Sequence, residues 1–274
     1  MAEEEFKATH VYVIPIFASL LVSVFCAFLI LQSQMMLNPL TIFPERGYGP
    51  VFNATIFVLA SGLGATMIFF LLKYNLQRFI RLLMAIAFSI LIFFLVIFYA
   101  ELVFVIVNIE FSFTVSLFLA LLATIFVLWE IFVRKGWFYE VFILVLGGAT
   151  GTLLGASIPT ISAVLILLLL AVYDVIAVFR GPVGKIAAKG LENLPGASFS
   201  FKNMNVGLGD LVFYSMLVSH MLLNFGWEIC IAAIFGVLLG SFLSFKMVEK
   251  KGMFPGLPFS ILFGLLASVV VLWI

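Results

Sequence analysis

Long apolar runs, separated by short polar segments, dominate this chain. Most of the runs approach the ~20 residues that an α-helix needs to cross a bilayer. They are continuous rather than alternating, which excludes a transmembrane β-barrel. The pattern therefore predicts an all-α protein with nine membrane-spanning helices. Their expected ranges are residues 11–31, 51–72, 82–104, 112–133, 137–157, 159–179, 208–223, 227–245 and 258–274.

Two stretches of this pattern need interpretation. Residues 82–133 contain no glycine or proline and are too long for one crossing, so we divide them near residues 108–110. Residues 181–206 are polar and rich in glycine and proline, which favours a flexible loop. Because we find no soluble domain and no internal repeat, we expect a single membrane domain. It consists of a five-helix part (1–157) and a four-helix part (158–274) that contains the loop.

The composition agrees with a membrane protein. The 274 residues are 65% hydrophobic and 10% charged, whereas about a quarter of the residues in a typical soluble domain are charged. The net charge of +1 gives no indication of a nucleic-acid partner. The two cysteines, Cys26 and Cys230, lie within apolar runs and are expected to be small packing residues.

The basic residues predict the orientation of the chain. With a cytoplasmic N-terminus and nine crossings, the cytoplasmic segments contain thirteen of the fourteen lysines and arginines, and only Arg46 lies outside. Cytoplasmic segments of membrane proteins are enriched in these residues. The distribution therefore supports both the number of spans and a C-terminus outside.

Candidate chemistry comes from two carboxyl groups within apolar runs. The only aspartates among thirteen acidic residues are Asp174, six residues before Arg180, and Asp210, at the start of the seventh span. An ionisable group is costly in hydrocarbon, so its presence there indicates a functional site. At 1.5 Å per residue, Asp174 lies about 9 Å from the cytoplasmic end of its helix. Antiparallel neighbouring helices can bring both carboxyls together in the inner third of the membrane.

Such a pair is suited to peptide hydrolysis. Two carboxyls a few ångströms apart in a medium of low dielectric constant do not both ionise readily, so one holds a proton while the other is charged. The charged carboxyl can take a proton from water while the neutral one donates a proton to the scissile carbonyl. Gly207 and Gly209 remove side chains just before Asp210, where a backbone must come close.

Three motifs resemble segments of presenilins. Residues 171–178, which include Tyr173-Asp174, resemble the Tyr-Asp segment of that family. Residues 207–218 are similar to its Gly-x-Gly-Asp segment and to the Tyr-Ser-x-Leu-Val that follows. Pro255-Gly256-Leu257 resembles the Pro-Ala-Leu segment before the last span, with Gly256 where the family has alanine. On these motifs the chain is identified as a member of the presenilin and signal peptide peptidase family of intramembrane aspartyl proteases.

The resemblance implies a presenilin-like fold, catalytic roles for Asp174 and Asp210, and a site lined by residues 255–257. We expect an unwound stretch of a single-pass transmembrane substrate to pair with the backbone near two segments. These expected substrate-binding residues are Gly207, Leu208, Gly209, Pro255, Gly256 and Leu257. Tyr173 is expected either to orient a carboxyl or the substrate, or simply to pack.

The resemblance also implies a compact homologue of prokaryotic, archaeal type that works without obligate partner subunits. The expected partners are the lipid bilayer and the substrate, with the formation of a homo-oligomer left open. No metal, other cofactor or nucleic acid is expected. The only histidines are His10 and His220, which excludes a His-Glu-x-x-His zinc site. His220 lies about 15 Å along its helix from Asp210, so we expect it to be a packed or interfacial residue.

Two other functions stay open on the sequence. A proton- or ion-coupled transporter or leak channel could use the same aspartates as a relay, and it would produce flux without peptide products. A non-catalytic scaffold would tolerate alanine at both aspartates. Glycines at four-residue spacing (Gly147, Gly151 and Gly155) are expected to form a packing seam rather than a site.

Overall fold

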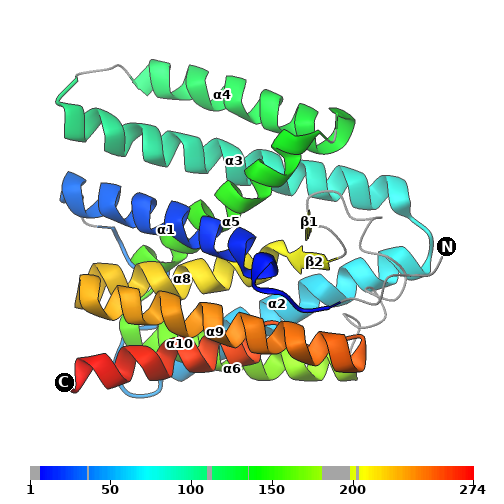
Figure 1. The fold of residues 1–274 in the computed structure, drawn as a ribbon. Coiled ribbons are helices and arrows are strands. Elements are labelled where there is room, and N and C mark those ends of the chain that lie inside the picture. The colour runs from blue at the N-terminus through cyan, green and yellow to red at the C-terminus, as the bar shows by residue number, and fades with distance from the viewer. Residues whose placement is uncertain (1–6, 36, 110–112, 135, 181–197, 202–203) are drawn as a thin grey trace.

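The computed structural model describes residues 7–35, 37–109, 113–134, 136–180, 198–201 and 204–274. Within these residues the protein is a bundle of nine long helices with a two-stranded sheet at one end (Figure 1). The helices are α1 (Ile14–Ser33), α2 (Gly49–Lys73), α3 (Gln77–Val107), α4 (Phe113–Trp129), α5 (Trp137–Ser157), α6 (Thr160–Phe179), α8 (Leu208–Phe225), α9 (Trp227–Lys251) and α10 (Leu257–Leu272). The strands are β1 (Ser198–Phe201) and β2 (Met204–Gly207).

The predicted division of the longest apolar run is confirmed. α3 ends at Val107, and Asn108 follows in the left-handed conformation with φ of 53°. Asparagine tolerates this conformation better than most residues, which makes it a common helix terminator. α4 begins at Phe113 and is continued by a π-helical turn, Glu130–Arg134.

Two helices extend beyond their predicted ranges. α3 begins at Gln77 rather than 82, and α9 continues to Lys251 rather than ending at 245. The predicted ranges ended at charged residues because these are unfavourable in hydrocarbon. Charged residues do not interrupt the backbone hydrogen bonds of a helix, so both helices continue through them. Among the described residues, eight helices are long and apolar enough to cross a membrane, and α10, with 16 residues, is shorter.

The prediction of a flexible loop for residues 181–206 is wrong for its last part, which contains two strands. β1 and β2 form an antiparallel pair in which Phe199 lies opposite Val206. Their phenylalanine and valine residues favour strands, but the glycine- and proline-rich composition of the whole segment obscures this short signal. The remainder of the predicted loop, residues 181–197 and 202–203, lies outside the described residues.

α8 occupies the centre of the bundle, where it packs against α1, α5, α9 and α10. The closest approach is made by the glycine seam of α5, as predicted. A Cβ atom on Gly151 would lie 2.3 Å from the carbonyl oxygen of Val212, and one on Gly155 would lie 2.7 Å from that of Met216. The absence of side chains therefore lets the two backbones touch.

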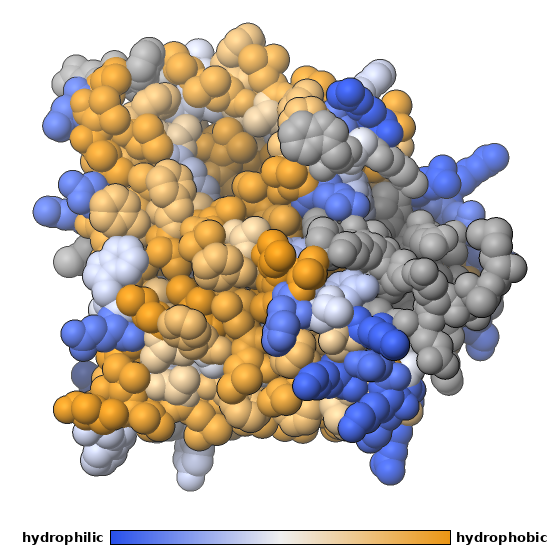
Figure 2. All heavy atoms as spheres, viewed as in Figure 1, coloured by the Kyte–Doolittle hydropathy of each residue, from blue (hydrophilic) through white to orange (hydrophobic). Residues whose placement is uncertain are grey.

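The site residues gather at one end of the bundle. α6 and α9 finish at the end where β1 and β2 lie, and α8 and α10 begin there, whereas α10 finishes at the opposite end (Figure 1). Apolar side chains cover the middle of the visible face, and hydrophilic residues gather mainly toward its two ends (Figure 2). Asp174, Asp210 and residues 255–257 therefore share the end that carries the sheet.

Candidate active site

Asp210 lies in the first turn of α8, which follows β2 directly. Its carboxyl group is next to Gly256: a Cβ atom built on Gly256 would lie 2.7 Å from Oδ2 of Asp210. Nonbonded contacts of real Cβ atoms are essentially never this short. The carboxyl therefore occupies the space that a side chain at position 256 would need.

Asp174 lies in the second-last turn of α6 and reaches the same segment. The backbone N–H of Leu257 donates a hydrogen bond to its Oδ2 at 3.1 Å. Two consecutive residues, Gly256 and Leu257, thus contact the two carboxyl groups, which are close enough to interact electrostatically. The structure brings together the two aspartates that the sequence placed on separate helices.

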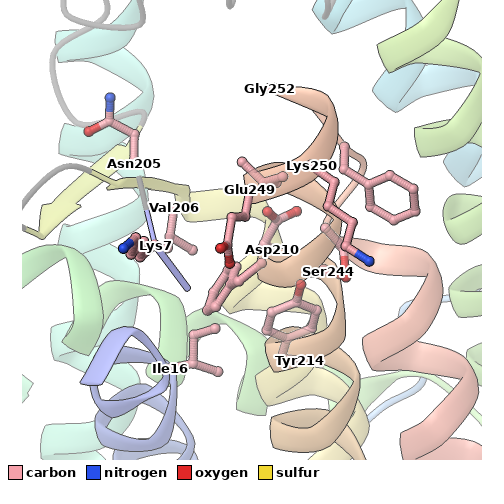
Figure 3. Close-up of a pocket in the computed structure, with 14 residues that line it drawn as sticks. Lys7, Ile16, Asn205, Val206, Asp210, Tyr214, Ser244, Glu249, Lys250 and Gly252 are labelled. Carbon is pink, nitrogen blue, oxygen red and sulfur yellow. Dashed lines mark hydrogen bonds between the residues drawn. The ribbon is translucent and has the colours of Figure 1, made fainter. Parts of the chain in front are cut away.

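A cavity of about 710 Å³ opens beside Asp210. Asp210, Tyr214 and Glu249 point toward a common space, and Val206 of β2 lies beside it (Figure 3). Asp174 is not among the residues that line this cavity in the described part of the chain. Since one water molecule takes about 30 Å³ of liquid volume, the space can hold water together with a stretch of peptide.

Charged residues surround the mouth of the cavity. Lys7, Glu249 and Lys250 line it together with Asp210. The carboxylate of Glu249 accepts a hydrogen bond from the backbone N–H of Ala8 at 3.0 Å, which attaches the start of the described chain to α9. The cavity is therefore polar at its mouth and is bounded by apolar helices further in.

The other predicted site residues have different surroundings. Tyr173 is half-buried and packs on α2, with its Cε2 atom 3.3 Å from the Cβ position of Gly62. This contact agrees with the packing alternative, and a part of Tyr173 in orienting a carboxyl or the substrate stays a prediction. Gly207 ends β2, and its Cβ position is 3.7 Å from Oδ2 of Asp210, whereas no atom lies within 4 Å of that of Gly209. Leu208 packs against the core.

Pro255 and Leu257 are both buried, so their side chains help fix the segment that carries Gly256. Tyr214, which was not predicted as a site residue, is buried and also lines the cavity. Its hydroxyl oxygen is 3.2 Å from the Cβ position of Gly256. The available signal was its spacing, because a residue four positions after Asp210 lies on the same helix face.

Three buried serines lie next to this site, and no sequence pattern pointed to them. Ser241 of α9 and Ser260 of α10 are within hydrogen-bonding distance, with 2.9 Å between their Oγ atoms, and both are neighbours of the Tyr214 hydroxyl. Ser244, one turn after Ser241, reaches the carbonyl oxygen of Gly256 at 3.4 Å. These hydroxyls form a buried polar cluster next to the site.

His220 lies away from the aspartates, and its predicted packing role is confirmed. It is buried, with Nδ1 2.7 Å from the carbonyl oxygen of Gly155 and Nε2 3.2 Å from Oγ1 of Thr160. Within the described ranges there is no group of three or more His, Cys, Asp or Glu residues that could hold a metal ion. The chemistry that this geometry supports is proton transfer by paired carboxyls to and from a water molecule.

Two family models match the chain. The model described as "Signal-peptide peptidase, presenilin aspartyl protease" matches residues 17–194, which is more than half of the sequence. The model described as "Presenilin" matches residues 187–273. Presenilin-B of Dictyostelium discoideum is 34% identical over 114 residues, which cover 37% of this chain. The match spans only 24% of that longer protein.

Solved structures resemble the whole bundle. Two crystal forms of a presenilin family intramembrane aspartate protease superpose with TM-scores of 0.67 and 0.68. They cover 95% and 94% of this chain, and 96% and 97% of the solved chains. The sequence identities are 18% and 19%, so this likeness shows the fold.

Proposed function

The chain belongs to the signal-peptide-peptidase and presenilin family of aspartyl proteases, and we propose that it is an intramembrane aspartic endopeptidase with Asp174 and Asp210 as its catalytic residues. The observation that carries the proposal is the convergence of both carboxyl groups on one short segment. Leu257 donates its N–H to Asp174, and Gly256 lies against Asp210. Such a junction, beside a cavity at the ends of apolar helices, is what hydrolysis in a membrane requires.

The proposed reaction uses one charged and one neutral carboxyl. The charged member takes a proton from a water molecule as the water attacks the scissile carbonyl carbon, and the neutral member donates its proton to the carbonyl oxygen. Breakdown of the tetrahedral intermediate then releases a new carboxyl terminus and a new amine. A hydrogen bond from a backbone N–H is best accepted by a carboxylate, so the contact from Leu257 favours Asp174 as the charged member.

The substrate must present extended backbone to this site. A helical peptide bond is shielded by its own hydrogen bonds, so a transmembrane substrate has to unwind locally. We propose that the unwound stretch adds as a strand to β2 and approaches residues 207–209 and 255–257. Support comes from the cavity wall, where Asn205 and Val206 of β2 lie together with Gly256.

We further propose a cytoplasmic N-terminus, an outside C-terminus and single-pass substrates whose own N-termini are outside. The support is the distribution of lysine and arginine, which places thirteen of fourteen on one side. The protein is proposed to work without partner subunits, so that purified chain is sufficient for activity. Formation of a homo-oligomer stays an open part of this proposal.

The test uses purified chain in liposomes with a single-pass transmembrane peptide as substrate. Wild type is expected to cut the peptide, while Asp174→Ala and Asp210→Ala each lose activity by about 10³-fold or more, the loss typical of removing an essential group. Glu228→Ala, which removes an exposed carboxyl at the start of α9, is the matched control and should cleave normally.

Mass spectrometry of the products and circular dichroism of each variant complete the experiment. Cleavage by either aspartate variant at the wild-type rate, with its fold intact, would overturn the assignment of the site. Aspartate-dependent proton or ion flux across the liposome without peptide products would instead favour the transporter.

A further inference from the structure

One peptide group in the site has hydrogen-bond partners on both of its polar atoms. The N–H of Leu257 points to Oδ2 of Asp174 at 3.1 Å. The carbonyl oxygen of the same peptide group, which belongs to Gly256, accepts hydrogen bonds from Ser260 at 3.2 Å and from Ser244 at 3.4 Å. These two serines are 0% and 2% exposed, and they come from α10 and α9.

We propose that Ser260 and Ser244 are positioning residues that act on Asp174 through the Gly256–Leu257 peptide group. The inference rests on the proposed function, because it assigns these serines to the orientation of one catalytic carboxyl. Both serines contact the carbonyl oxygen of Gly256; Ser244 also lines the cavity, whereas Ser260 is not among its lining residues in the described part of the chain. Their role is to orient the N–H group of Leu257, which donates the hydrogen bond to Asp174.

The planarity of the peptide bond makes this connection possible. In a trans peptide the carbonyl and the N–H point in opposite directions and cannot turn separately. Two hydroxyls that fix the carbonyl oxygen of Gly256 therefore also fix the direction of the Leu257 N–H. A hydrogen bond accepted by the carbonyl polarises the amide and strengthens the bond that its N–H donates.

The position of this peptide group in the fold leaves its N–H available. Leu257 is the first residue of α10, and the first N–H groups of a helix have no acceptor within the helix. In the described structure that donor is used by Asp174. The unpaired N–H group at the start of α10 thus connects this helix to the Asp174 carboxyl on α6.

Ser241 and Tyr214 extend the arrangement. A hydroxyl has one proton, so Ser260 can donate to Gly256 only if Ser241 donates to Ser260, at 2.9 Å, instead of to the carbonyl oxygen of Val237, which lies 2.8 Å from the Ser241 Oγ. The chain of donors then runs from Ser241 to Ser260 to the Gly256 carbonyl. The Tyr214 hydroxyl lies beside both serines and close to Asp210, so the same cluster borders both halves of the pair.

The simpler explanation is that these are ordinary helix serines. A serine in an apolar helix often donates to the carbonyl four residues earlier, and Ser268 does so to Gly264 at 2.8 Å. Ser260 differs from Ser268 because its carbonyl partner belongs to the peptide group that binds Asp174, and because Ser244 from another helix reaches the same oxygen. Ser268 is therefore the matched control.

The test compares Ser260→Ala, the double variant with Ser244→Ala, and Ser268→Ala in the liposome assay. We expect kcat to fall about tenfold in Ser260→Ala and further in the double variant, since each loses a hydrogen bond of ordinary strength. KM should stay within about twofold in Ser260→Ala, because Ser260 is not among the residues that line the cavity in the described part of the chain. Ser260→Thr keeps the hydroxyl and should restore most of kcat, while Ser268→Ala should behave as wild type.

A second measurement does not depend on turnover. The infrared carboxyl absorption of Asp174, identified by its loss in Asp174→Asn, should change frequency in Ser260→Ala and stay unchanged in Ser268→Ala. Equal behaviour of Ser260→Ala and Ser268→Ala in both measurements, or a rise in KM at constant kcat, would overturn the positioning role while leaving the proposed function intact. A wild type that cuts no peptide would overturn the proposed function and, with it, this role.

Discussion

The two helices that carry the aspartates are held in different ways. In the most apolar stretch of α8, 61% of the residues are buried inside the protein, against 39% in α6. α8 is enclosed by α1, α5, α9 and α10, whereas α6 packs mainly on α2 and α10 and makes few contacts with α8 itself. One carboxyl is therefore carried by the centre of the bundle and the other by its edge.

This difference shows how the pair is assembled. Asp210 is fixed by the packing of its own helix, which leaves little freedom to the backbone around it. Asp174 relies on contacts at the two ends of α6: Glu45 at the start of the helix, and the N–H of Leu257 near its end. Changes within α8 should therefore act on folding, and changes around α6 should act mainly on the geometry of the pair.

The largest effect is expected from Gly151→Ala in the seam between α5 and α8. The new Cβ atom would lie 2.3 Å from the carbonyl oxygen of Val212 and 2.5 Å from Cβ of Ser215, so the backbones must separate. Overpacking of this kind costs about 3 kcal/mol. Thermal unfolding in detergent should show a much lower midpoint, and activity should fall with the folded fraction.

Gly64→Ala on α2 is the matched control for this substitution. Apart from the backbone of α2 itself, no atom lies within 4 Å of the Cβ position of Gly64, so a methyl group has room there. Its unfolding midpoint should equal or slightly exceed that of wild type, because alanine favours a helix more than glycine does. An equal loss in both variants would show that α8 is not held more tightly than α2.

Gly256→Ala should affect activity more than stability. The added methyl group would lie 2.7 Å from Oδ2 of Asp210 and 3.2 Å from the Tyr214 hydroxyl, and a carboxyl group can turn away at lower cost than a backbone can move. We expect kcat to fall about 10- to 100-fold, the range seen when a reacting group is misplaced, with an unfolding midpoint near that of wild type. Unchanged kcat would mean that the carboxyl is not held in the position seen here.

The surroundings of Gly256 also show which features of the fold and the site could be predicted from the sequence and which could not. The motifs predicted Asp174, Asp210 and residues 255–257 as site residues, and the hydrophobic pattern predicted the nine helices of the described structure, because both signals are local. Contacts that depend on packing were not visible in the sequence. Nothing near Ser244 indicates that its hydroxyl meets the carbonyl oxygen of Gly256, because this contact depends on how α9 packs against the start of α10.

The contact of Glu45 with α6 is a second case. Glu45 accepts hydrogen bonds from the N–H groups of Ile161 and Ser162 at 3.2 and 3.0 Å, and it also contacts the Ser162 hydroxyl. Because its partners are more than a hundred residues away, no local capping pattern could reveal it. Pro159, which the sequence correctly placed at the start of the helix, provides no capping side chain.

Glu45→Ala is the next largest change and acts on the start of α6. Loss of a capping carboxylate typically costs about 1 kcal/mol, so we expect a modest drop in the unfolding midpoint. Activity should fall by a few fold because α6 carries Asp174 at its other end. Arg46→Ala, one residue further on, is the matched control and should leave both measurements unchanged. A wild-type midpoint in Glu45→Ala would show that packing alone holds this end of α6.

The smallest effect is expected from Gly62→Ala on α2. Its Cβ atom would lie 3.3 Å from Cε2 of Tyr173, and the half-buried ring can shift by a few tenths of an ångström to accommodate it. Stability should change by less than about 0.5 kcal/mol, and kcat by less than about twofold, because Tyr173 packs on α2 instead of facing the cavity. Gly64→Ala is again the control, because it makes the same change in helix propensity but adds no contact with Tyr173. A large loss of kcat in Gly62→Ala, at normal stability, would mean that the packing of α2 on Tyr173 sets the position of Asp174, and that the edge of the bundle controls the pair as strongly as its centre does.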